Sequence, residues 1–586
     1  MKKNNVQIKS DLHNISKAFS FVYKSDKKLC LARFALITLQ SILPLASLYL
    51  LKLLVDSVTN SSTAQMSNNN FSGIWFYAGL FCAVFLLIRI SNVLITFIDE
   101  ILTQKLIDYI SRLLHQKSSE LDLAFYDKSE YHDTFHRAQQ EAGYRPIQIL
   151  NNLTGIIRDS LSLAGIVIIL TTLSFWVIVI MILTALPALF VKLWKAKILF
   201  DWQNKNTSIF RKANYFSNLL TNRVYAKEIR IFNLTNYFQS QFNSIRKKLV
   251  KEILKIIKSR ANFDVLSTFF EAGALFAIII LLCQKSLAGA ITIGSFVMLF
   301  EAFRRGQGFI QGIVANLSGL YSNKLFLNNL FKFLELKPNI NSPFKPIRFP
   351  DKIKEGIVFK DVSFSYPDSD KLVLDHFSFE AKPGNLAHIK GINGAGKTTM
   401  IKLLCRLYEC TKGAIYIDGI NIKDFDLFEL RNNISVIFQD FVQYDFSVYQ
   451  NIALGDMENE NSLEKIIRAA KLSVADEVIE NLPNGYDTLL GKYFEKGEEL
   501  SMGQWQRMAL ARALTKDSQI LILDEPTSWM DELAASGFYK QLSILKQNRI
   551  LLLISHAKTE IVEYENNDIS NEETAYINLQ KKTPSS

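Results

Sequence analysis

Apolar residues gather in six long stretches in the first part of the chain. Each stretch is close to the length of about 20 residues that an α-helix needs to cross the hydrocarbon core of a bilayer. The stretches cover residues 30–58, 74–98, 149–170, 175–193, 263–283 and 291–314. Soluble proteins rarely contain six helices without a polar face, so the pattern predicts six transmembrane helices rather than buried core helices.

Lysine and arginine indicate how these helices are oriented. The loop "SVTNSSTAQMSNNNFS" between the first two stretches has none, whereas "SIRKKLVKEILKIIKSR" lies between the fourth and fifth. Basic residues collect on the cytoplasmic side of membrane proteins, so we expect both termini and the two long loops, 103–146 and 195–262, to be cytoplasmic. These loops are longer than connections require, and we expect them to extend the helices beyond the membrane.

The pattern changes after "LELKPNINSPFKPIRFPDK", where prolines among lysines indicate a linker. Strand-like alternation begins at "GIVFKDVSFSYPD". We therefore expect three parts: a cytoplasmic N-terminal segment (1–29), a transmembrane domain (30–338) and a soluble α/β domain (339–586). The first thirty residues are polar and lysine-rich, unlike a cleavable signal peptide.

Composition argues against nucleic-acid binding and against a disulfide framework or a zinc site. The chain has 586 residues and a net charge of +11, and the predicted cytoplasmic loops account for this excess without nucleic-acid binding. Its five cysteines lack the spacing of a disulfide framework or a zinc site, which fits a reducing compartment.

A phosphate-binding loop is predicted in "NLAHIKGINGAGKTTMIKLL", an apolar strand followed by G-x-x-x-x-G-K-T and an apolar helix. The glycines allow a tight turn whose amides point at a phosphate chain, with Lys397 on the outer phosphates and Thr398 on Mg²⁺. The predicted nucleotide contacts in this loop are Gly391, Asn393, Gly394, Ala395, Gly396, Lys397, Thr398 and Thr399.

Two carboxylates end a buried strand in "ILILDEPTS". We expect Asp524 to bind Mg²⁺ through water and Glu525 to polarise the water that attacks the nucleotide. Two carboxylates at a strand end can also be merely structural, but beside a phosphate-binding loop the chemical interpretation is favoured.

From Val358 to His556 the chain resembles the nucleotide-binding domain of an ABC transporter, with its motifs in the usual order: "FSYPD", "IFQD", "LSMGQ", "SWMD" and "ISHA". The resemblance implies that Tyr366 stacks on the adenine of ATP and that Gln439 reaches toward Mg²⁺. Tyr366 could instead be a surface strand residue. The resemblance implies that His556 is the family's catalytic switch. A lone histidine after a strand is more often structural, but the position of His556 after "RILLLIS" favours the functional interpretation.

The same resemblance assigns "LSMGQ" as the family signature, with Ser501, Gly503 and Gln504 contacting phosphate, and Asp531 as the D-loop aspartate. The sequence departs from the family at Met502, which replaces a glycine, and at Trp529 and Met530, which replace smaller residues. After His556 the family continues with a strand, whereas the acidic, polar tail of this chain lacks strand signals.

In this family the signature of one chain completes the ATP site of another. The resemblance therefore implies a dimer with two composite sites. Both halves of the site look intact in this chain, which favours a homodimer over a heterodimer. The implied fold is multi-domain: an all-α six-helix transmembrane domain followed by an α/β P-loop ATPase domain of the ABC type.

Six membrane helices followed by such a domain resemble the exporter branch of the family, in which loop segments near 126–136 and 224–232 would transmit motion. "FEKGEELSMGQWQRMALARAL" resembles exporters of antibacterial peptides such as lantibiotics and lasso peptides. Charged residues within the predicted spans are expected to face a cavity or one another, namely Arg89, Glu271, Glu301, Arg304 and Arg305. Export of a lipid or drug, or ATP-gated regulation without transport, remain alternatives.

Overall fold

A computed structural model of the protein describes residues 17, 19–63, 68–127, 145–172, 175–367, 369–459, 462–547, 549–555 and 574–579. The described chain divides into two compact units. One, the helical unit, holds the residues up to Ser119 and those from 145 to Leu336. The other, the α/β unit, holds residues 120–127 and those from Lys337 onward.

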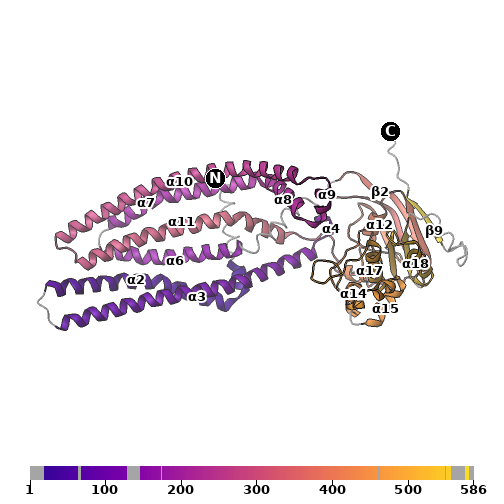
Figure 1. The fold of residues 1–586 in the computed structure, drawn as a ribbon, viewed down its shortest axis with the longest axis horizontal. Helices are drawn as coiled ribbons and strands as arrows, with labels where there is room; N and C mark the ends of the chain where they lie inside the picture. Colours follow the sequence, from indigo (N-terminus) through magenta and orange to yellow (C-terminus); the bar gives the residue numbers. More distant parts are fainter. Residues whose placement is uncertain are drawn as a thin grey trace. The chain divides into compact units, whose positions relative to one another are not determined.

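The helical unit is built from long helices that run alongside one another (Figure 1). Each of the six predicted apolar stretches falls wholly or largely within one of them. They are α2 (Lys27–Thr63), α3 (Asn68–Glu120), α6 (Arg145–Thr171), α7 (Phe175–Lys205), α10 (Thr235–Leu287) and α11 (Ile293–Glu335). Shorter pieces connect α7 to α10: α8 (Thr207–Thr221), η1 (Arg223–Tyr225) and α9 (Ala226–Ile231).

Four of these helices are long and apolar enough to cross a membrane by length and composition alone: α2, α3, α6 and α10. On α3, Trp75 and Val93 are 76% and 69% exposed. Large apolar side chains exposed to this degree are costly in water but suit a surface that faces lipid. The helical unit is therefore a multi-pass membrane domain.

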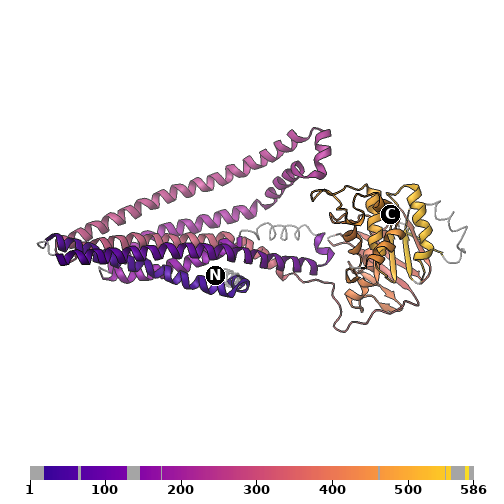
Figure 2. The same ribbon diagram turned by 60° about the horizontal axis from the view of Figure 1, so that its bottom comes forward.

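Inside this unit, apolar side chains from several helices form one buried cluster that includes Leu48, Ile166, Met181, Ile278 and Phe303. Figure 2 shows α10 diverging from the other helices toward the end that carries α8 and α9. Polar contacts still join it to α7, because the Trp202 indole N–H donates to Glu252 at 2.8 Å and Lys195 donates to Ser259 at 2.8 Å.

The charged residues of α11 within the apolar stretch have protein partners. Glu301 and Arg304 form a two-pronged ion pair, with a shortest distance of 2.9 Å. Arg305 donates to the Pro44 carbonyl at 3.2 Å and the Ser47 hydroxyl at 3.1 Å, both on α2. Pairing of this kind lowers the cost of placing charges at membrane depth.

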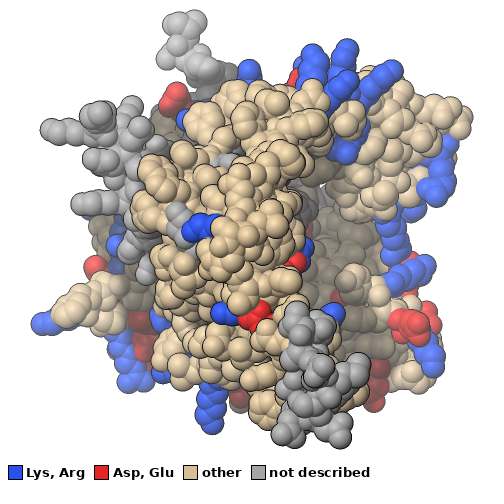
Figure 3. Space-filling view, turned by 90° about the vertical axis from the view of Figure 1, so that its left-hand side faces the viewer, with Lys and Arg blue, Asp and Glu red and all other residues tan. Residues whose placement is uncertain are grey.

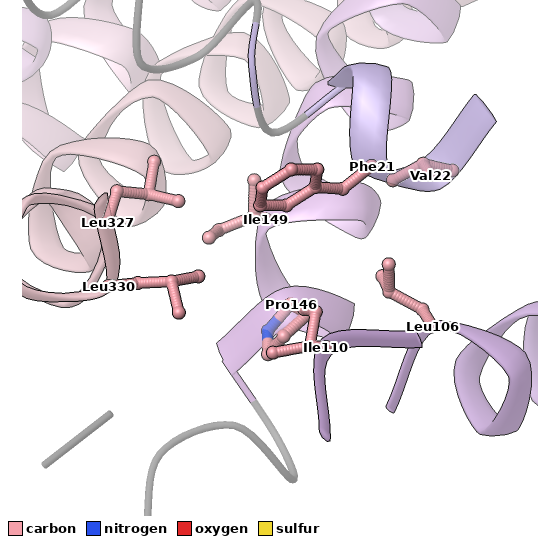
Figure 4. A pocket seen from close by; sticks show the side chains of 8 residues that line it. All are labelled: Phe21, Val22, Leu106, Ile110, Pro146, Ile149, Leu327 and Leu330. Carbon is pink, nitrogen blue, oxygen red and sulfur yellow. The ribbon is translucent and has the colours of Figure 1, made fainter. Parts of the chain in front are cut away.

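Two surfaces of the helical unit carry little charge. The middle of the face seen in Figure 3 is mostly uncharged, and lysines and arginines are seen mainly toward the edges of the view. A pocket between the N-terminal segment, α3, α6 and α11 is lined only by apolar and proline side chains (Figure 4). None of the predicted nucleotide-site residues lines this pocket, so it is not the ATP site.

The α/β unit contains two sheets. An antiparallel sheet has the order β2-β1-β4-β5 and a parallel sheet has the order β6-β7-β8-β3-β9. The strands are β1 (Ile357–Ser365), β2 (Leu372–Ala381), β3 (Leu386–Gly391), β4 (Lys412–Ile417), β5 (Ile420–Asn421), β6 (Ile434–Ile437), β7 (Ile520–Asp524), β8 (Ile550–Ile554) and β9 (Thr574–Leu579). Every residue of β7 and β8 is buried, as expected for a parallel sheet covered on both faces.

Helices surround these sheets. They are α12 (Lys397–Leu404), α13 (Leu427–Asn432), α14 (Val448–Ala453), α15 (Leu463–Leu472), α16 (Asp476–Glu480), α17 (Met502–Leu514) and α18 (Glu532–Leu545), with short turns η2 (Met457–Asn459) and η3 (Gly485–Asp487). Ile389, Met400 and Ile522 are fully buried where β3, α12 and β7 meet, which fixes the strand ends that carry the predicted site.

The strand β9 corrects the expectation that the C-terminal tail contains none. Residues 574–579, "TAYINL", pair with β3 in parallel register from Leu386↔Thr574 to Gly391↔Leu579. The segment alternates polar and apolar residues over only six positions within an acidic tail. Its pairing with β3 supplies the hydrogen bonds that this short pattern could not predict.

One short helix from the first long loop belongs to the α/β unit. The helix α4 (Leu123–Tyr126) follows Asp122, whose carboxylate accepts backbone N–H bonds from Asn339 at 2.6 Å and Ile340 at 3.2 Å. Leu123 and Ala124 pack against the apolar core of this unit. Described residues 126 and 127 therefore lie on the α/β unit, while the rest of predicted segment 126–136 falls outside the described residues.

Candidate nucleotide-binding site

Strand order brings the predicted motifs to one edge of the parallel sheet. The loop after β3, the carboxylates at the end of β7 and Gln439 just after β6 all follow the carboxyl ends of parallel strands in the order β6-β7-β8-β3. Open α/β sheets bind their ligands at this edge, outside the carboxyl ends of the strands.

The loop between β3 and α12 has the backbone of a phosphate cradle. Gly394 and Gly396 adopt left-handed φ values of 77° and 99°, and Gly396 is the residue that precedes α12. A Cβ atom on Gly396 would lie 2.7 Å from the Leu374 side chain, so only glycine fits. Gly391 ends β3, and Asn393 and Gly394 are exposed at the loop tip, whereas Ala395 is buried.

Lys397 begins α12 and turns back over the loop. Its ammonium donates to the carbonyls of Gly391 at 2.6 Å and Ile392 at 3.4 Å, and the residue is only 8% exposed. A buried cation at the N-terminus of a helix, among left-handed glycines, is suited to an anionic phosphate chain. The residues present therefore fit a nucleotide.

Asp524 and Thr398 form the second part of the site. The Thr398 hydroxyl donates to the Asp524 carboxylate at 3.0 Å. Burial of Asp524, which is 2% exposed, raises its pKa to about 6; the bond from Thr398 lowers the pKa and the nearby charge of Glu525 raises it. A buried carboxylate beside a hydroxyl offers the oxygen ligands that Mg²⁺ prefers.

No group of three or more His, Cys, Asp or Glu residues that could hold a metal occurs within the part of the chain that the structure describes.

Glu525 directly follows β7 and has a left-handed φ of 50°, a conformation that non-glycine residues rarely adopt. Its carboxylate accepts a hydrogen bond from the Gln439 amide at 2.9 Å. The structure thus brings two of the three predicted catalytic residues into contact. The third, His556, lies outside the described residues, next to Ser555 after β8.

Tyr366 lies beside the phosphate-binding loop. Its hydroxyl and that of Thr399 on α12 are 2.9 Å apart and share a hydrogen bond. The ring also packs edge-on against Tyr408, with ring centroids 5.3 Å apart. The side chain is partly exposed, and the Lys402 ammonium lies over its ring, 5.7 Å from the centroid.

The signature residues form the N-terminal turn of α17. Ser501 precedes the helix and accepts from the backbone N–H of Gln504 at 3.3 Å, while the Gln504 side chain accepts from the N–H of Ser501 at 2.9 Å. Met502 is the first helical residue and its φ is not left-handed. Its side chain is 42% exposed, and its sulfur accepts from Gln443 at 3.1 Å.

The D-loop lies against this helix. A Cβ atom on Gly503 would come within 2.4 Å of the Trp529 carbonyl oxygen, so glycine is required for this close approach. Asp531 precedes α18, accepts from the N–H of Ala534 at 2.8 Å and receives a 2.9 Å bond from Arg507. The signature and the D-loop are therefore one packed assembly within the chain.

Two residues that hold the segments around the site in place were not predicted from the sequence. Gln506 joins α17 to the segment after β7, and Asp122 joins α4 to the linker. The bonded residues are separated by 19 and 217 positions, so no local pattern indicates them.

A glycine-rich loop that joins a parallel strand to a helix, with a buried carboxylate at the end of a nearby strand, defines a P-loop nucleotide hydrolase.

A model of the ABC transporter family matches residues 374–528. The subtilin transport ATP-binding protein SpaT of Bacillus subtilis is 29% identical, over 93% of this chain and 88% of its own. The nisin transport ATP-binding protein NisT of Lactococcus lactis subsp. lactis is 26% identical, over 93% of this chain and 90% of its own.

An ATP-dependent lipid A-core flippase of Nitrosococcus oceani is 30% identical over 68% of this chain and 66% of its own. A solved structure of a bacterial Atm1-family ABC exporter with ATP bound shares the fold, with a TM-score of 0.77, 19% identity and 92% of each chain covered.

This chain belongs to the ABC transporters: it is an exporter half-transporter in which a helical membrane domain is fused to an ATPase domain. It is an ATP-binding ATPase coupled to transport, and half-transporters of this kind function as dimers.

Proposed function

We propose that this chain forms a homodimer in the cytoplasmic membrane, with both termini and the ATPase domain in the cytoplasm, and exports a peptide at the expense of ATP. One observation supports the peptide cargo above others. The two relatives that align along 93% of the chain are named for subtilin and nisin transport, whereas the lipid A-core flippases align along 55–78%.

The chemistry we propose for the nucleotide follows from the contacts in the site. Lys397 neutralises the outer phosphates of ATP, and the amides of residues 393–399 bind the phosphate oxygens. Thr398, Asp524 and Gln439 hold Mg²⁺, which supplies positive charge where negative charge develops in phosphoryl transfer. Tyr366 stacks on the adenine.

Glu525 polarises the attacking water. Its carboxylate is bonded to the Gln439 amide at 2.9 Å, so Gln439 is placed to orient the carboxylate as well as to approach the ion. We propose that His556 assists from the loop after β8, the strand next to β7.

The signature completes the site of the other subunit. Ser501, Gly503 and Gln504 form a helix N-terminus, where the helix dipole favours an anion. In the proposed dimer this turn contacts the ATP bound by the partner's loop. Nucleotide then shifts the dimer toward its closed state because it binds that state more tightly.

Transport assays in proteoliposomes test this function. Protein reconstituted with the ATPase domain outward should accumulate a lantibiotic-type peptide in the lumen when Mg-ATP is added, and the peptide should raise ATP turnover. Glu525→Gln should abolish accumulation while ATP binding persists, because a neutral amide cannot accept a proton from the attacking water. Near-normal hydrolysis by Glu525→Gln would refute the role of Glu525.

The same liposomes separate the alternatives. Lipid A-core flippases among the relatives, at 27–32% identity, favour a lipid cargo as the second candidate. A lipid exporter would move labelled lipid between leaflets and leave peptide outside. A regulator that transports nothing would show no ligand-stimulated turnover with either compound.

A further inference from the structure

Gln506 is a buried amide that connects the signature helix to the end of β7. The residue is 1% exposed, and its side-chain nitrogen donates to the carbonyl of Glu525 at 2.8 Å and to the Ser528 hydroxyl at 3.3 Å. Its side-chain oxygen accepts from the backbone N–H of Trp529 at 2.9 Å. Both ends of one amide are thus committed to the segment 525–529.

This segment contains a residue whose backbone needs support. Glu525 has a left-handed φ of 50°, a strained conformation for a residue with a Cβ atom. Its N–H donates to the Ile554 carbonyl of β8 at 2.9 Å, and its carbonyl accepts from Gln506. The two bonds hold opposite sides of the same residue, and the direction of the Glu525 carboxylate depends on that backbone.

A second contact joins the same two segments. Gly503, two residues after Ser501, lies so close to the Trp529 carbonyl that a Cβ atom would be 2.4 Å from it. The N-terminal half of α17 therefore contacts the segment after Glu525 through backbone packing at Gly503 and through hydrogen bonds at Gln506.

We propose that Gln506 is a positioning residue for ATP hydrolysis: it holds the left-handed backbone of Glu525 so that the carboxylate points at the attacking water. Because Ser501 directly precedes α17, Gln506 connects the turn that contacts the partner's ATP to the carboxylate that acts on the chain's own ATP. This inference rests on the proposed role of Glu525.

Gln506→Met tests the inference, because methionine has a similar length and shape but cannot make these hydrogen bonds. In the full-length reconstituted protein we expect kcat to fall by about 10- to 100-fold, the scale on which a misplaced catalytic group acts. The KM for ATP and the affinity for ATP measured without hydrolysis should change less than about twofold, since the Gln506 side chain forms its hydrogen bonds with residues 525–529 and not with the phosphate-binding loop.

The matched control is Gln519→Met, at the opposite end of β7. The Gln519 amide also makes three bonds: it donates to the Pro350 carbonyl at 2.7 Å and to Asn433 at 3.3 Å, and accepts from the N–H of Ile353 at 2.7 Å. This variant loses the same number of hydrogen bonds and should melt at a lower temperature. Its kcat should equal that of the wild type.

The pH dependence of turnover in Gln506→Glu distinguishes a positioning role from a general effect on stability. A protonated carboxyl has one donor and one acceptor and can replace the amide, whereas an ionised one only accepts. Burial favours the protonated form and raises the pKa of such a carboxyl. The turnover of Gln506→Glu relative to wild type should therefore rise as the pH falls from about 8 to about 6.

Three results would overturn the inference: wild-type kcat in Gln506→Met, an equal loss of kcat in Gln519→Met, or a flat pH ratio for Gln506→Glu. Failure of the proposed function looks different. If Glu525→Gln keeps near-normal turnover, the role of Glu525 is wrong, whatever the Gln506 variants do.

Discussion

Burial disfavours the ionised form of the Asp524 carboxylate. It is 2% exposed, and removal from water raises its pKa to about 6, so near neutral pH its charge is maintained at a cost to folding. The role we propose requires that charge, because an ionised carboxylate binds Mg²⁺ through water. The charge on Asp524 thus lowers the stability of the protein without Mg²⁺, and the same charge is what binds the ion in the proposed site.

We expect Asp524→Asn to stabilise the protein in the absence of Mg²⁺. The folded pKa exceeds that of an unfolded aspartate, so the native state binds more protons between about pH 4 and 6 and loses stability as the pH rises through this window. Above about pH 6 the variant should gain on the order of 2–3 kcal/mol in free energy of unfolding. Denaturant unfolding in detergent measures the difference.

The pH dependence is the control for this prediction. The gain should shrink as the pH falls toward 4 and vanish below about pH 3, where wild-type Asp524 is protonated in both states. A gain of equal size at every pH would mean that the substitution acts through packing or through the bond from Thr398, and not through the charge.

At the level of elements, the short helix α4 shows how a loop from the membrane half becomes part of the ATPase half. The Asp122 carboxylate accepts two backbone N–H bonds from the linker, and the Tyr408 hydroxyl donates to the Asp127 carboxylate. That contact and burial raise the pKa of Tyr408, so it remains a donor at any working pH. These bonds attach both ends of α4 to the α/β unit.

Asp122→Ala should weaken coupling between cargo and ATP turnover. It leaves two backbone N–H groups without their acceptor, at a cost of roughly 1–3 kcal/mol, so α4 separates more readily from the α/β unit. We expect basal ATP turnover to persist and cargo-stimulated turnover to fall, as measured in proteoliposomes with and without peptide.

Asp426→Ala is the matched control for α4. Its carboxylate also accepts two backbone N–H bonds, from Phe428 and Glu429, but it caps α13 rather than fastening α4. Both variants should be less stable, and only Asp122→Ala should lose cargo stimulation. Equal loss in the two would show that general destabilisation is responsible.

For the whole molecule, composite sites can be tested by complementation between subunits. A dimer of one Ser501→Arg chain and one Lys397→Ala chain keeps one intact site, made from the loop of the first and the signature of the second. We expect roughly half of wild-type turnover if the two sites act independently.

The control places both substitutions in one chain beside a wild-type partner, which damages both sites and should abolish turnover. If each chain instead uses its own signature, the dimer of single variants should be inactive and this control should keep about half of wild-type turnover, so that reversed result would refute the composite site. Tagging the two chains differently and purifying through both tags isolates the mixed dimers for the assay.

Local patterns predicted most of the elements. The apolar stretches fall within long helices because about 20 apolar residues have one way to satisfy their backbone in a bilayer. The loop from Gly391 to Thr399 lies between β3 and α12 as predicted, because glycine spacing and strand–helix order are encoded within 20 residues. The strand β9 was missed, because six alternating residues gain their stability from β3, almost 190 positions away.

The sequence by itself thus predicted where the long apolar helices, the glycine-rich loop and the carboxylates at the end of β7 lie, because each depends on neighbours along the chain. Only the tertiary structure decided that α4 packs on the α/β unit, that Met502 begins a helix with an ordinary backbone, and that Gln506 forms a hydrogen bond with Glu525. These features depend on hydrogen bonds and close contacts between distant segments, and folding alone brings those segments together.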